Sequence, residues 1–304
     1  MRKFTKTGIG TLLMLSVSFI GTAQMPNVST GSLRRVTDFP SRIVMPRNID
    51  IWLPAGYDPK NRKYAVLYMQ DGQMLFDSTV TWNKQEWMVD ETLGELMMRK
   101  QIRDVIVVGI WNTITYRHAE YFPEKAIAHV PEAYRKELMP LLRNKALADD
   151  YLRFLVTELK PWVDSNYATL RDRSNTFIAG SSMGGLISLY AVCEYPAVFH
   201  GAACLSTHWT GTFEDKDNPI PSALEKYLVT HLPDPSDHKF YFDHGTLTLD
   251  SMYRVHQDAV DSIFRGAGYS LFNYSSRIFE GDDHSERSWA ARFYIPAMFL
   301  LSGK

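Results

Sequence analysis

An apolar run that ends in a glycine-flanked serine, Asn175-Thr176-Phe177-Ile178-Ala179-Gly180-Ser181-Ser182-Met183-Gly184-Gly185, is the most informative segment of this sequence. A second apolar segment, Leu186 to Tyr195, follows it directly. Gly180, Ser182 and Gly184 occupy the fixed positions of the pattern G-x-S-x-G, in which a strand turns sharply into a helix. The segment therefore predicts a nucleophile elbow, with the hydroxyl of Ser182 exposed above the end of a strand.

The elbow requires small residues at fixed places. Residues two before and two after the serine approach each other, so a Cβ atom at Gly180 or Gly184 would collide with the neighbouring strand or helix. The helix that follows would direct its first amides, and the positive end of its dipole, toward an oxyanion beside Ser182. The same letters also occur in glycine-rich turns without chemistry, but the strand before the motif and the helix after it favour a catalytic serine.

Length, charge and cysteine content narrow the class of protein. The chain has 304 residues, with 33 basic and 34 acidic side chains, so it lacks the basic surplus typical of nucleic-acid-binding proteins. No long apolar span follows the N-terminal region, and no membrane helix is expected in the mature protein. Cys193 and Cys204 are predicted to be buried free thiols, and two cysteines at that spacing cannot assemble a metal site.

The N-terminal segment has the features of a secretory signal peptide. Arginine and lysine side chains within the first six residues precede an apolar stretch from residues 8 to 21, and small residues follow up to Ala23. We expect residues 1–23 to be cleaved, which leaves residues 24–304 as the mature protein; a short membrane anchor is the alternative. Because no cysteine lies near the cleavage site, a lipoprotein anchor is not expected, and the mature protein is predicted to be periplasmic or secreted.

Strand and helix patterns alternate along the mature chain. Apolar runs of strand length are expected at residues 41–54, 64–69, 104–110, 175–181, 201–206, 239–243 and 270–280. Helices are expected at residues 88–99, 145–167, 186–195, 221–232, 250–266 and 286–301, with a kink at Pro161. Residues 111–144 have no clean period and are interpreted as a long ordered loop with at most a short helix. The alternation predicts one α/β domain over residues 24–304, with a mostly parallel sheet covered by helices on both faces.

A catalytic serine needs a base, and chain order restricts the candidates. A serine hydroxyl is a weak nucleophile at neutral pH, and it is activated by a histidine that a third group orients. In the order serine, acid, histidine, the base must follow Ser182. The histidines that do so are His200, His208, His231, His238, His244, His256 and His284. We expect His284 to be the base, because its loop follows the last predicted strand and lies at the carboxyl edge of the sheet.

Two aspartates compete for the role of the acid. The acid should lie in the loop after the sixth predicted strand, which offers Asp243 and Asp250. Asp243 closes the strand and can point into the turn, so the pattern favours Asp250. Asp282 and Asp283 are close to His284 in sequence, but neighbouring residues rarely face each other, and we expect both to be solvated.

The remaining site residues follow from their places at the carboxyl edge of the sheet. The oxyanion hole is predicted to use the backbone amide of Met183, which follows the serine, and that of Gln73 or its neighbour, in the loop after an early buried strand. Trp111, His208 and Trp209 fall in predicted rim loops and are expected to line the substrate site, with His208 contacting substrate rather than acting as the base. This chemistry requires no cofactor and no metal ion.

Several segments together resemble the putative esterase family of the α/β-hydrolase superfamily. They are residues 64–76 with Asp71-Gly72-Gln73, 107–110 followed by Arg117 and Glu120-Tyr121, 154–167 with Glu158-Leu159-Lys160-Pro161, 180–185, and 281–289. The family includes esterase D-like enzymes, siderophore esterases and feruloyl or acetyl-xylan esterases. The resemblance covers most of the mature chain and implies an α/β-hydrolase fold.

The resemblance also implies site residues and exposes one departure. It implies Ser182 as the nucleophile, His284 as the base and the same two oxyanion-hole amides. Feruloyl-esterase-like members tend to carry the acid three residues after the glycine of a Gly-Thr motif, and Thr248 occupies that position here. The acid is therefore expected at Asp250, or the site works as a Ser-His dyad, as siderophore esterases of the family are thought to do.

These features predict an exported serine carboxylic ester hydrolase that acts by two-step acyl transfer on a small or carbohydrate-linked acyl ester, of acetyl or feruloyl type. A siderophore ester is the alternative substrate for the same chemistry. Acyl transfer to an acceptor other than water would use the same residues, and a binding protein that has lost activity is a third alternative. The expected partner is a small-molecule or saccharide ester, and neither a nucleic acid nor, in the mature form, a membrane.

Overall fold

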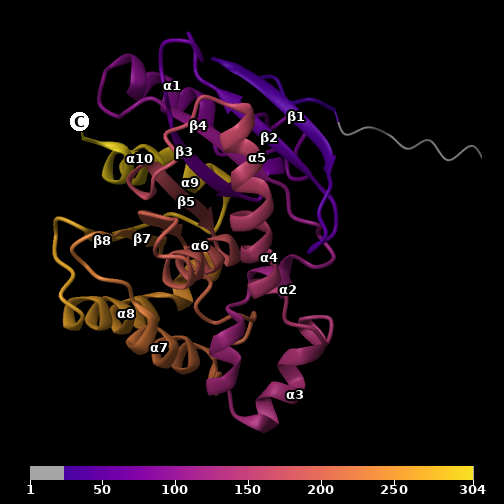
Figure 1. Cartoon of the computed structure of the whole chain (residues 1–304). Coiled ribbons are helices and arrows are strands. Elements are labelled where there is room, and N and C mark those ends of the chain that lie inside the picture. The colour runs from indigo at the N-terminus through magenta and orange to yellow at the C-terminus, as the bar shows by residue number, and fades with distance from the viewer. Residues whose placement is uncertain (1–23, 304) are drawn as a thin grey trace, which may run out of the picture.

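An eight-stranded sheet forms the centre of the computed structural model, which describes residues 24–303 (Figure 1). Its strands are β1 Ser32–Phe39, β2 Arg47–Leu53, β3 Ala65–Gln70, β4 Val105–Ile110, β5 Thr176–Ser181, β6 Gly201–Leu205, β7 Lys239–Gly245 and β8 Tyr274–Phe279. In space their order is β1-β2-β4-β3-β5-β6-β7-β8. Strands β3 to β8 run parallel, whereas β2 pairs antiparallel with both β1 and β4. The predicted mostly parallel α/β sheet is confirmed, and the predicted signal peptide at residues 1–23 lies outside the described residues.

Helices join the strands and cover both faces of the sheet (Figure 1). They are α1 Val89–Met98, α2 Arg117–Tyr121, α3 Glu132–Leu141, α4 Ala148–Phe154, α5 Lys160–Asn166, α6 Met183–Glu194, α7 Ile220–His231, α8 Arg254–Gly266, α9 Glu286–Arg292 and α10 Tyr294–Leu301. One apolar layer, with Tyr121, Tyr151 and Leu186, packs α2, α4 and α6 on one face. A second layer, with Leu93 and Trp289, packs α1 and α9 on the other. Because β3 to β6 are fully buried between these layers, their carboxyl ends meet at one rim.

Three features differ from what the sequence pattern predicts. The expected loop at residues 111–144 instead contains α2, a 3₁₀ helix at Glu124–His129, and α3. Helix α3 is a short helix that buries only Leu138 completely, with Tyr134 and Met139 partly buried against the same core. In the predicted helix around Pro161, a π turn at Leu155–Leu159 separates α4 from α5. Strand β1 was not predicted, because it is a half-exposed edge strand without strict alternation.

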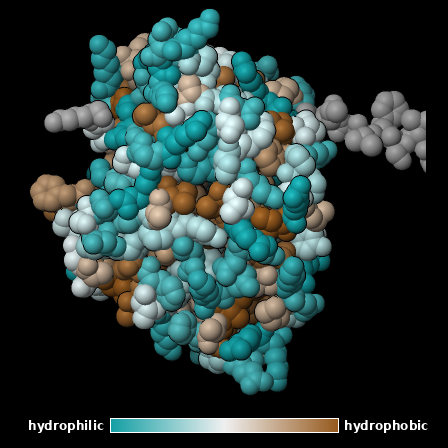
Figure 2. Space-filling model, in the orientation of Figure 1, coloured by the Kyte–Doolittle hydropathy of each residue, from teal (hydrophilic) through white to brown (hydrophobic). Residues whose placement is uncertain are grey.

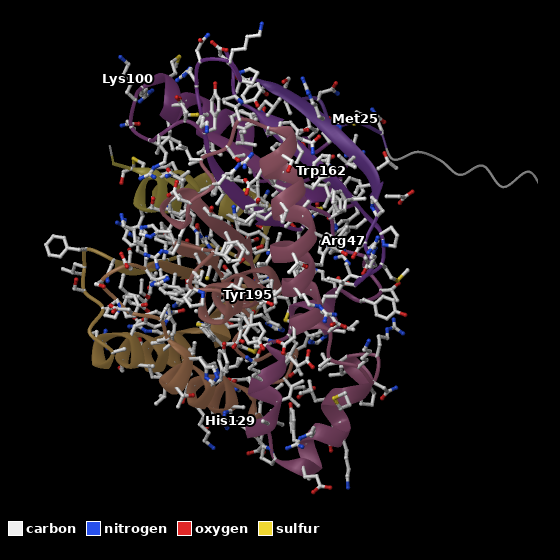
Figure 3. The ribbon with its side chains drawn as sticks, in the orientation of Figure 1. Met25, Arg47, Lys100, His129, Trp162 and Tyr195 are labelled. Atoms are coloured by element: carbon white, nitrogen blue, oxygen red, sulfur yellow. The ribbon has the colours of Figure 1, made fainter. Side chains whose placement is uncertain are left out.

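A buried ion pair ties the antiparallel side of the sheet to the segment after β4. Arg47, labelled in Figure 3 and first in β2, donates to the Glu120 carboxylate at 2.6 and 2.9 Å. Both side chains are almost inaccessible, and the guanidinium carbon of Arg47 lies 5.2 Å from the ring centroid of Tyr151. Because an unpaired buried charge is costly, this pair fixes α2 and with it Arg117, the first residue of α2.

The surface of the described chain is mixed in polarity. On the face in Figure 2, hydrophobic side chains form small groups between hydrophilic ones. The large apolar side chains that are more than four-fifths exposed are Trp82, Ile114, Phe213, Leu271 and Phe272. Among residues 24–303, no helix is long and apolar enough to cross a membrane.

The two cysteines are buried and free, as predicted. Burial raises the pKa of the Cys193 and Cys204 thiols, so neither is a reactive thiolate at neutral pH. Among the described residues, no group of three His, Cys, Asp or Glu side chains could hold a metal ion.

Candidate active site

Ser182 lies at the sharp turn between β5 and α6. Its backbone has φ 56° and ψ −125°, and a conformation so rarely populated typically costs about 1–3 kcal/mol. A Cβ atom at Gly180 would lie 2.6 Å from the backbone of Gly184, and one at Gly184 would lie 3.0 Å from Gln70 Cβ. The Ser182 N–H donates to Leu205 O at 2.9 Å, which anchors the turn to β6. The strand, sharp turn and helix expected of the elbow are therefore present.

His284 faces a buried carboxylate from the loop between β8 and α9. Its Nδ1 atom lies 2.5 Å from Oδ1 of Asp250, which is fully buried. Tyr253 and Trp289 pack edge-on against the imidazole, with centroid distances of 5.9 and 5.1 Å. One hydrogen bond and two aromatic neighbours thus hold the ring, and Nε2 is the nitrogen turned away from the acid.

Asp250 has three hydrogen-bond partners. Besides its contact with His284, its Oδ2 accepts from Ser206 Oγ and from the Gly245 amide, each at 2.6 Å. Burial raises the pKa of Asp250, but the hydrogen bond and charge of His284, with the donors Ser206 and Gly245, outweigh burial and leave the pKa below its ordinary value. Asp250 is therefore ionised at neutral pH and keeps a proton on Nδ1 of His284.

The hydroxyl of Ser206, directly after β6, is oriented by two donors. Trp289 Nε1 donates to Ser206 Oγ at 2.9 Å, and Arg292 Nη2 donates at 3.0 Å. Because both acceptor sites are occupied, the hydroxyl hydrogen points to Asp250. Sequence reasoning did not find Ser206, Trp289 or Arg292; the only signal was the place of Ser206 at the rim beside the predicted lining residues.

Hydrogen bonds join the loops that carry the acid and the histidine. The His284 amide donates to Thr248 Oγ1 at 2.9 Å, and the Thr246 amide donates to Asp282 O at 3.0 Å. Glycine is required at position 245, since a Cβ atom there would lie 2.2 Å from Asp282 O. Thr248, which holds the place of the acid in feruloyl-esterase-like sequences, therefore positions the loop of His284.

The other candidate acids have partners of their own. Asp243 is fully buried, and its Oδ1 accepts from Arg292 Nη2 at 3.0 Å. Burial raises the pKa of Asp243 above its ordinary value despite the opposing charge of Arg292. Asp282 accepts from Arg292 Nη1 at 2.8 Å, and Asp283 accepts from two serine hydroxyls, so both are hydrogen-bonded rather than simply solvated. The His284 ring contacts Asp250 and not these residues.

A chain of contacts links Ser182 with His284. The Ser182 amide donates to Leu205 O, and the next residue, Ser206, donates to Asp250, the partner of His284. Within residues 24–303, no hydrogen bond joins Ser182 Oγ directly to His284 Nε2. Catalytic hydrogen bonds of this kind are often long without substrate and tighten when it binds.

The two amides predicted for the oxyanion hole lie at the carboxyl ends of neighbouring strands. Met183 is the first residue of α6, and Gln73 lies in the 3₁₀ helix Gly72–Met74 that follows β3. Neither amide donates a hydrogen bond to another atom of the described chain. Both are therefore available donors at the carboxyl ends of adjacent strands, β3 and β5.

An ion pair orders the loop that carries Gln73. Arg117 donates to both carboxylate oxygens of Asp71 at 2.7 Å, and Asn112 Nδ2 donates to the same carboxylate at 2.7 Å. The Asn112 amide also donates to Gln73 Oε1 at 3.2 Å. A Cβ atom at Gly184 would lie 3.2 Å from Asp71 Oδ2, so this network lies against the elbow.

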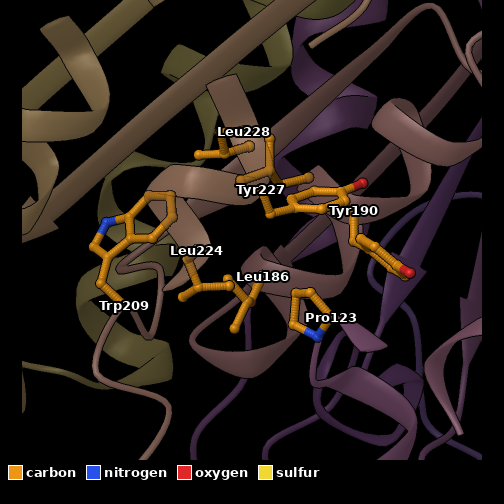
Figure 4. A pocket seen from close by; sticks show the side chains of 8 residues that line it. Pro123, Leu186, Tyr190, Trp209, Leu224, Tyr227 and Leu228 are labelled. Carbon is orange, nitrogen blue, oxygen red and sulfur yellow. The ribbon is translucent and has the colours of Figure 1, made fainter. Parts of the chain in front are cut away.

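The two tryptophans predicted to line the site are held in other contacts. The Trp111 indole donates to Asp50 Oδ2 at 2.8 Å, on the antiparallel side of the sheet. Trp209 is 1% exposed, donates to Gln257 Oε1 at 3.0 Å, and lines a small apolar cavity with residues of α6 and α7 (Figure 4). Trp209 thus offers no exposed face to a ligand in this structure, and contact with substrate stays a prediction for both tryptophans.

Of the three residues predicted to line the substrate site, His208 is the one that contacts the elbow. Its backbone amide donates to Ser182 O at 3.2 Å. Its Nδ1 atom lies 2.7 Å from the hydroxyl of Tyr253, whose ring packs against His284. His208 therefore forms a second link between the serine and the histidine.

The α/β-hydrolase class is defined by a mostly parallel sheet with a serine at a strand-to-helix elbow. A buried aspartate and then a histidine follow the serine along the chain and lie at the same edge of the sheet, as they do here. Within this class, the sequence model of the family described as "Putative esterase" matches residues 41–294. The chain therefore belongs to that family, and the resemblance inferred from its sequence is confirmed.

Individual relatives are more distant. The endo-1,4-beta-xylanase/feruloyl esterase of Xylanibacter ruminicola is 26% identical over 213 residues, which are 68% of this chain and 25% of that protein. Two curated relatives from Bacillus subtilis are matched over 58% and 50% of their length. The chain thus spans less than two-thirds of the length of each of these relatives.

Solved structures share the fold. The enterobactin esterase of Shigella flexneri superposes with a TM-score of 0.67 at 16% identity, over 90% of this chain and 60% of that chain. A ferulic acid esterase superposes with a TM-score of 0.64 at 19% identity, over 89% of this chain and 98% of that chain. At these identities the likeness establishes the α/β-hydrolase fold.

Proposed function

We propose that this protein is a serine carboxylic ester hydrolase in which Ser182, Asp250 and His284 act as nucleophile, acid and base. The observation that carries the proposal is the 2.5 Å contact between His284 Nδ1 and the buried Asp250, at the rim where the strained Ser182 follows β5. Membership of an esterase family supports the same class of reaction.

The proposed reaction has two acyl-transfer steps. Ser182 Oγ attacks the ester carbonyl carbon while His284 Nε2 takes the serine proton. The Met183 and Gln73 amides receive the negative charge that develops on the carbonyl oxygen, and each such donor is typically worth about 3 kcal/mol in the transition state. The alcohol leaves with the proton from His284, and the acyl group stays on Ser182. His284 Nε2 then takes a proton from a water molecule as the water oxygen attacks the acyl carbon. The bond between that carbon and Ser182 Oγ breaks, the carboxylic acid leaves, and His284 returns the proton to Ser182 Oγ.

Asp250, the acidic member of the triad, acts as an ionised carboxylate and neither gives nor takes a proton during the reaction. Its carboxylate accepts from Nδ1 of His284, which fixes the tautomer with Nε2 free to accept the serine proton. The imidazolium that forms is stabilised by the adjacent negative charge. The hydrogen bond and charge of His284, followed by the donors Ser206 and Gly245 on the other carboxylate oxygen, keep the pKa of Asp250 below its ordinary value despite its burial.

The proposed substrate is a small or carbohydrate-linked acyl ester of acetyl or feruloyl type. A curated relative is named a feruloyl esterase, and solved structures of the same fold are named ferulic acid esterases. A siderophore ester is the second candidate, because another structure of this fold is an enterobactin esterase. The two candidate substrates are distinguished by comparing turnover of feruloylated or acetylated saccharides with turnover of a catechol trilactone. A separate test addresses acyl transfer: a faster reaction with an added alcohol acceptor than with water would indicate an acyltransferase.

We also propose that the protein is exported to the periplasm or the medium as residues 24–304. The support is the basic, then apolar, then small-residue pattern of residues 1–23. An N-terminus at Gln24 in protein recovered from the periplasm or medium is the expected result, and an intact Met1 would contradict export by this route.

The experiment that tests the enzymatic proposal is hydrolysis of p-nitrophenyl acetate by the mature protein and by Ser182→Ala. We expect the substitution to lower kcat by on the order of 10⁴-fold or more, because removal of the nucleophile removes the covalent route. Ser181→Ala is the matched control, since Ser181 is the neighbouring serine but is buried in β5. Activity that survives in Ser182→Ala, with the control unchanged, would refute the serine mechanism.

A further inference from the structure

His208 lies beside the proposed nucleophile, yet the proposed mechanism gives it no role. Its backbone amide donates to Ser182 O, and the residue is only 4% exposed. The imidazole also lies next to the ring of Phe213, with centroids 6.0 Å apart. The His208 backbone is therefore held against the serine, and the His208 ring packs beside another residue of the β6–α7 loop.

The contact with Tyr253 defines which nitrogen of His208 carries the hydrogen. Tyr253 is fully buried, and its hydroxyl lies 2.7 Å from His208 Nδ1. Within residues 24–303 the hydroxyl has no other hydrogen-bond partner, so it donates to Nδ1, because a buried O–H left without an acceptor would cost about 1–3 kcal/mol. The nearby Thr210 hydroxyl is already used, since it donates to Thr212 O at 2.7 Å. His208 therefore accepts at Nδ1 and carries its hydrogen on Nε2.

The same surroundings keep His208 uncharged. Burial, and then the nearby charges of His284, His118 and Arg117, lower the pKa of His208 to about 3. Tyr253 stays a phenol, because burial and then the charge of Asp250 raise its pKa above the ordinary value. At neutral pH the pair is thus a neutral phenol that donates to a neutral imidazole.

The Nε2–H group of His208 has no acceptor among residues 24–303 and is not fully buried. The residue as a whole is 4% exposed, so this group reaches the surface over a small area only. The adjacent Phe213 side chain is 85% exposed, which is unusual for a phenylalanine beside a buried histidine. A neutral donor and an exposed apolar ring therefore lie together, in the loop whose His208 amide binds Ser182 O.

We propose that His208 and Phe213 form a subsite for a hydroxyl-bearing ring of the ester substrate. The Nε2–H group donates to a ring hydroxyl, and the Phe213 ring packs on the apolar face of the same ring. Because the donor is neutral, we expect this subsite to bind an uncharged hydroxyl oxygen and not an anionic group. The inference rests on the proposed function, because Ser182 defines where the scissile ester lies. The hydroxyl can belong to the acyl group, as in a phenolic acid, or to the alcohol, as in a sugar.

Matched esters test the subsite and distinguish the two sources of the hydroxyl. Methyl 4-hydroxycinnamate and methyl cinnamate differ by one hydroxyl in the acyl group, and an acetylated monosaccharide and cyclohexyl acetate differ by hydroxyls in the alcohol. We expect the wild type to prefer the hydroxylated member of one pair by about three- to tenfold in kcat/KM, the range of one neutral hydrogen bond. His208→Phe should abolish that preference, and His208→Gln, whose Nε2 can replace the imidazole donor, should retain much of it.

The outcomes separate the subsite from the proposed function. An equal loss on both members of each pair in His208→Phe would mean a structural role and would overturn the subsite, as would a wild type without any preference. A wild type that turns over none of the esters, p-nitrophenyl acetate included, would instead refute the proposed function. Phe213→Ala should weaken the preference, and Phe272→Ala is its control, because Phe272 is 90% exposed in the connection between α8 and β8.

Nitrogen-15 NMR of the imidazoles provides a readout that does not depend on turnover. The signal assigned to His208 by its loss in His208→Gln should show a neutral ring protonated at Nε2 throughout the range from pH 5 to pH 8. Tyr253→Phe removes the donor to Nδ1 and should allow the other tautomer to appear. An Nδ1-protonated ring in the wild type, or a ring that titrates within this range, would contradict the subsite.

Discussion

Asp243, in β7, and Asp250, in the turn that follows, are alike in burial and opposite in electrostatics. Both are fully buried, and Arg292 Nη2 lies 3.0 Å from one and 4.0 Å from the other. Asp250 is bound by His284, Ser206 and Gly245, and its pKa is lowered. Asp243 Oδ2 has no partner within the described chain, and burial raises the pKa of Asp243.

Since burial is alike at the two sites, the difference in pKa direction follows from the donors around each carboxylate, whereas position leaves only Asp250 in contact with His284. Burial disfavours the charged form of both aspartates. At Asp250 the opposing hydrogen bonds exceed this cost, so a stable negative charge is available next to His284. At Asp243 the opposing interactions do not exceed the cost of burial, although the buried Arg292 guanidinium pairs with this carboxylate.

The largest expected difference between the two aspartates is in kcat, when each carboxylate is replaced by an amide in turn. Asp250→Asn should lower kcat for p-nitrophenyl acetate by on the order of 10⁴-fold, because an amide donor opposite His284 favours the wrong tautomer. Asp243→Asn should cause a far smaller loss, because the introduced amide oxygen can still accept from Arg292 and no contact with His284 changes. Steady-state kinetics of the two variants measure the difference. Equal losses would mean that the two aspartates act as one unit, and a larger loss in Asp243→Asn would reverse the assignment.

The free energy of unfolding should depend on pH in opposite ways for the two aspartates, and this effect is expected to be smaller than the effect on kcat. The pKa of Asp250 is lowered on folding, so its charge stabilises the fold above about pH 4 and this contribution is lost as the pH falls through the folded pKa. The pKa of Asp243 is raised, so its contribution is present below about pH 4 and is lost as the pH rises through the folded pKa.

Urea unfolding of the wild type and the two variants between about pH 2 and pH 8 measures this effect, because the Asp250 contribution changes below about pH 4 and the Asp243 contribution changes above it. Relative to the wild type, Asp250→Asn should be most destabilised at neutral pH, and Asp243→Asn should improve as the pH rises. Parallel profiles for the two variants would contradict the opposite pKa directions. Intact near-ultraviolet circular dichroism at neutral pH serves as the control for folding.

The elbow and the mostly parallel character of the sheet could be predicted because their signals are local. Three glycine-motif positions and the apolar runs around them sufficed for Ser182, and chain order then restricted the base to a few histidines, of which the final loop favoured His284. Asp250 and Asp243 could not be separated with the same certainty, because a pattern does not give the direction of a carboxylate. The structure shows which of them contacts His284.

The hydrogen-bond network around Asp250 could not be predicted from sequence patterns. Ser206 is 44 residues from Asp250, and Trp289 and Arg292 reach Ser206 from more than 80 residues away. No local period reports contacts at that separation. The prediction for residues 111–144 was wrong for a related reason. The helices of this segment are short, and α2 is held by the Arg47–Glu120 pair and by packing against α4 and α6, which no local pattern reports.

Covalent labelling with a small organophosphorus fluoride at neutral pH tests whether Ser182 is a nucleophile activated by His284. We predict one phosphoryl group per chain, located on Ser182 by peptide mass spectrometry, and a much slower reaction in His284→Ala. A label on another residue, or full ester hydrolysis by protein that takes up no label, would contradict this activation of Ser182.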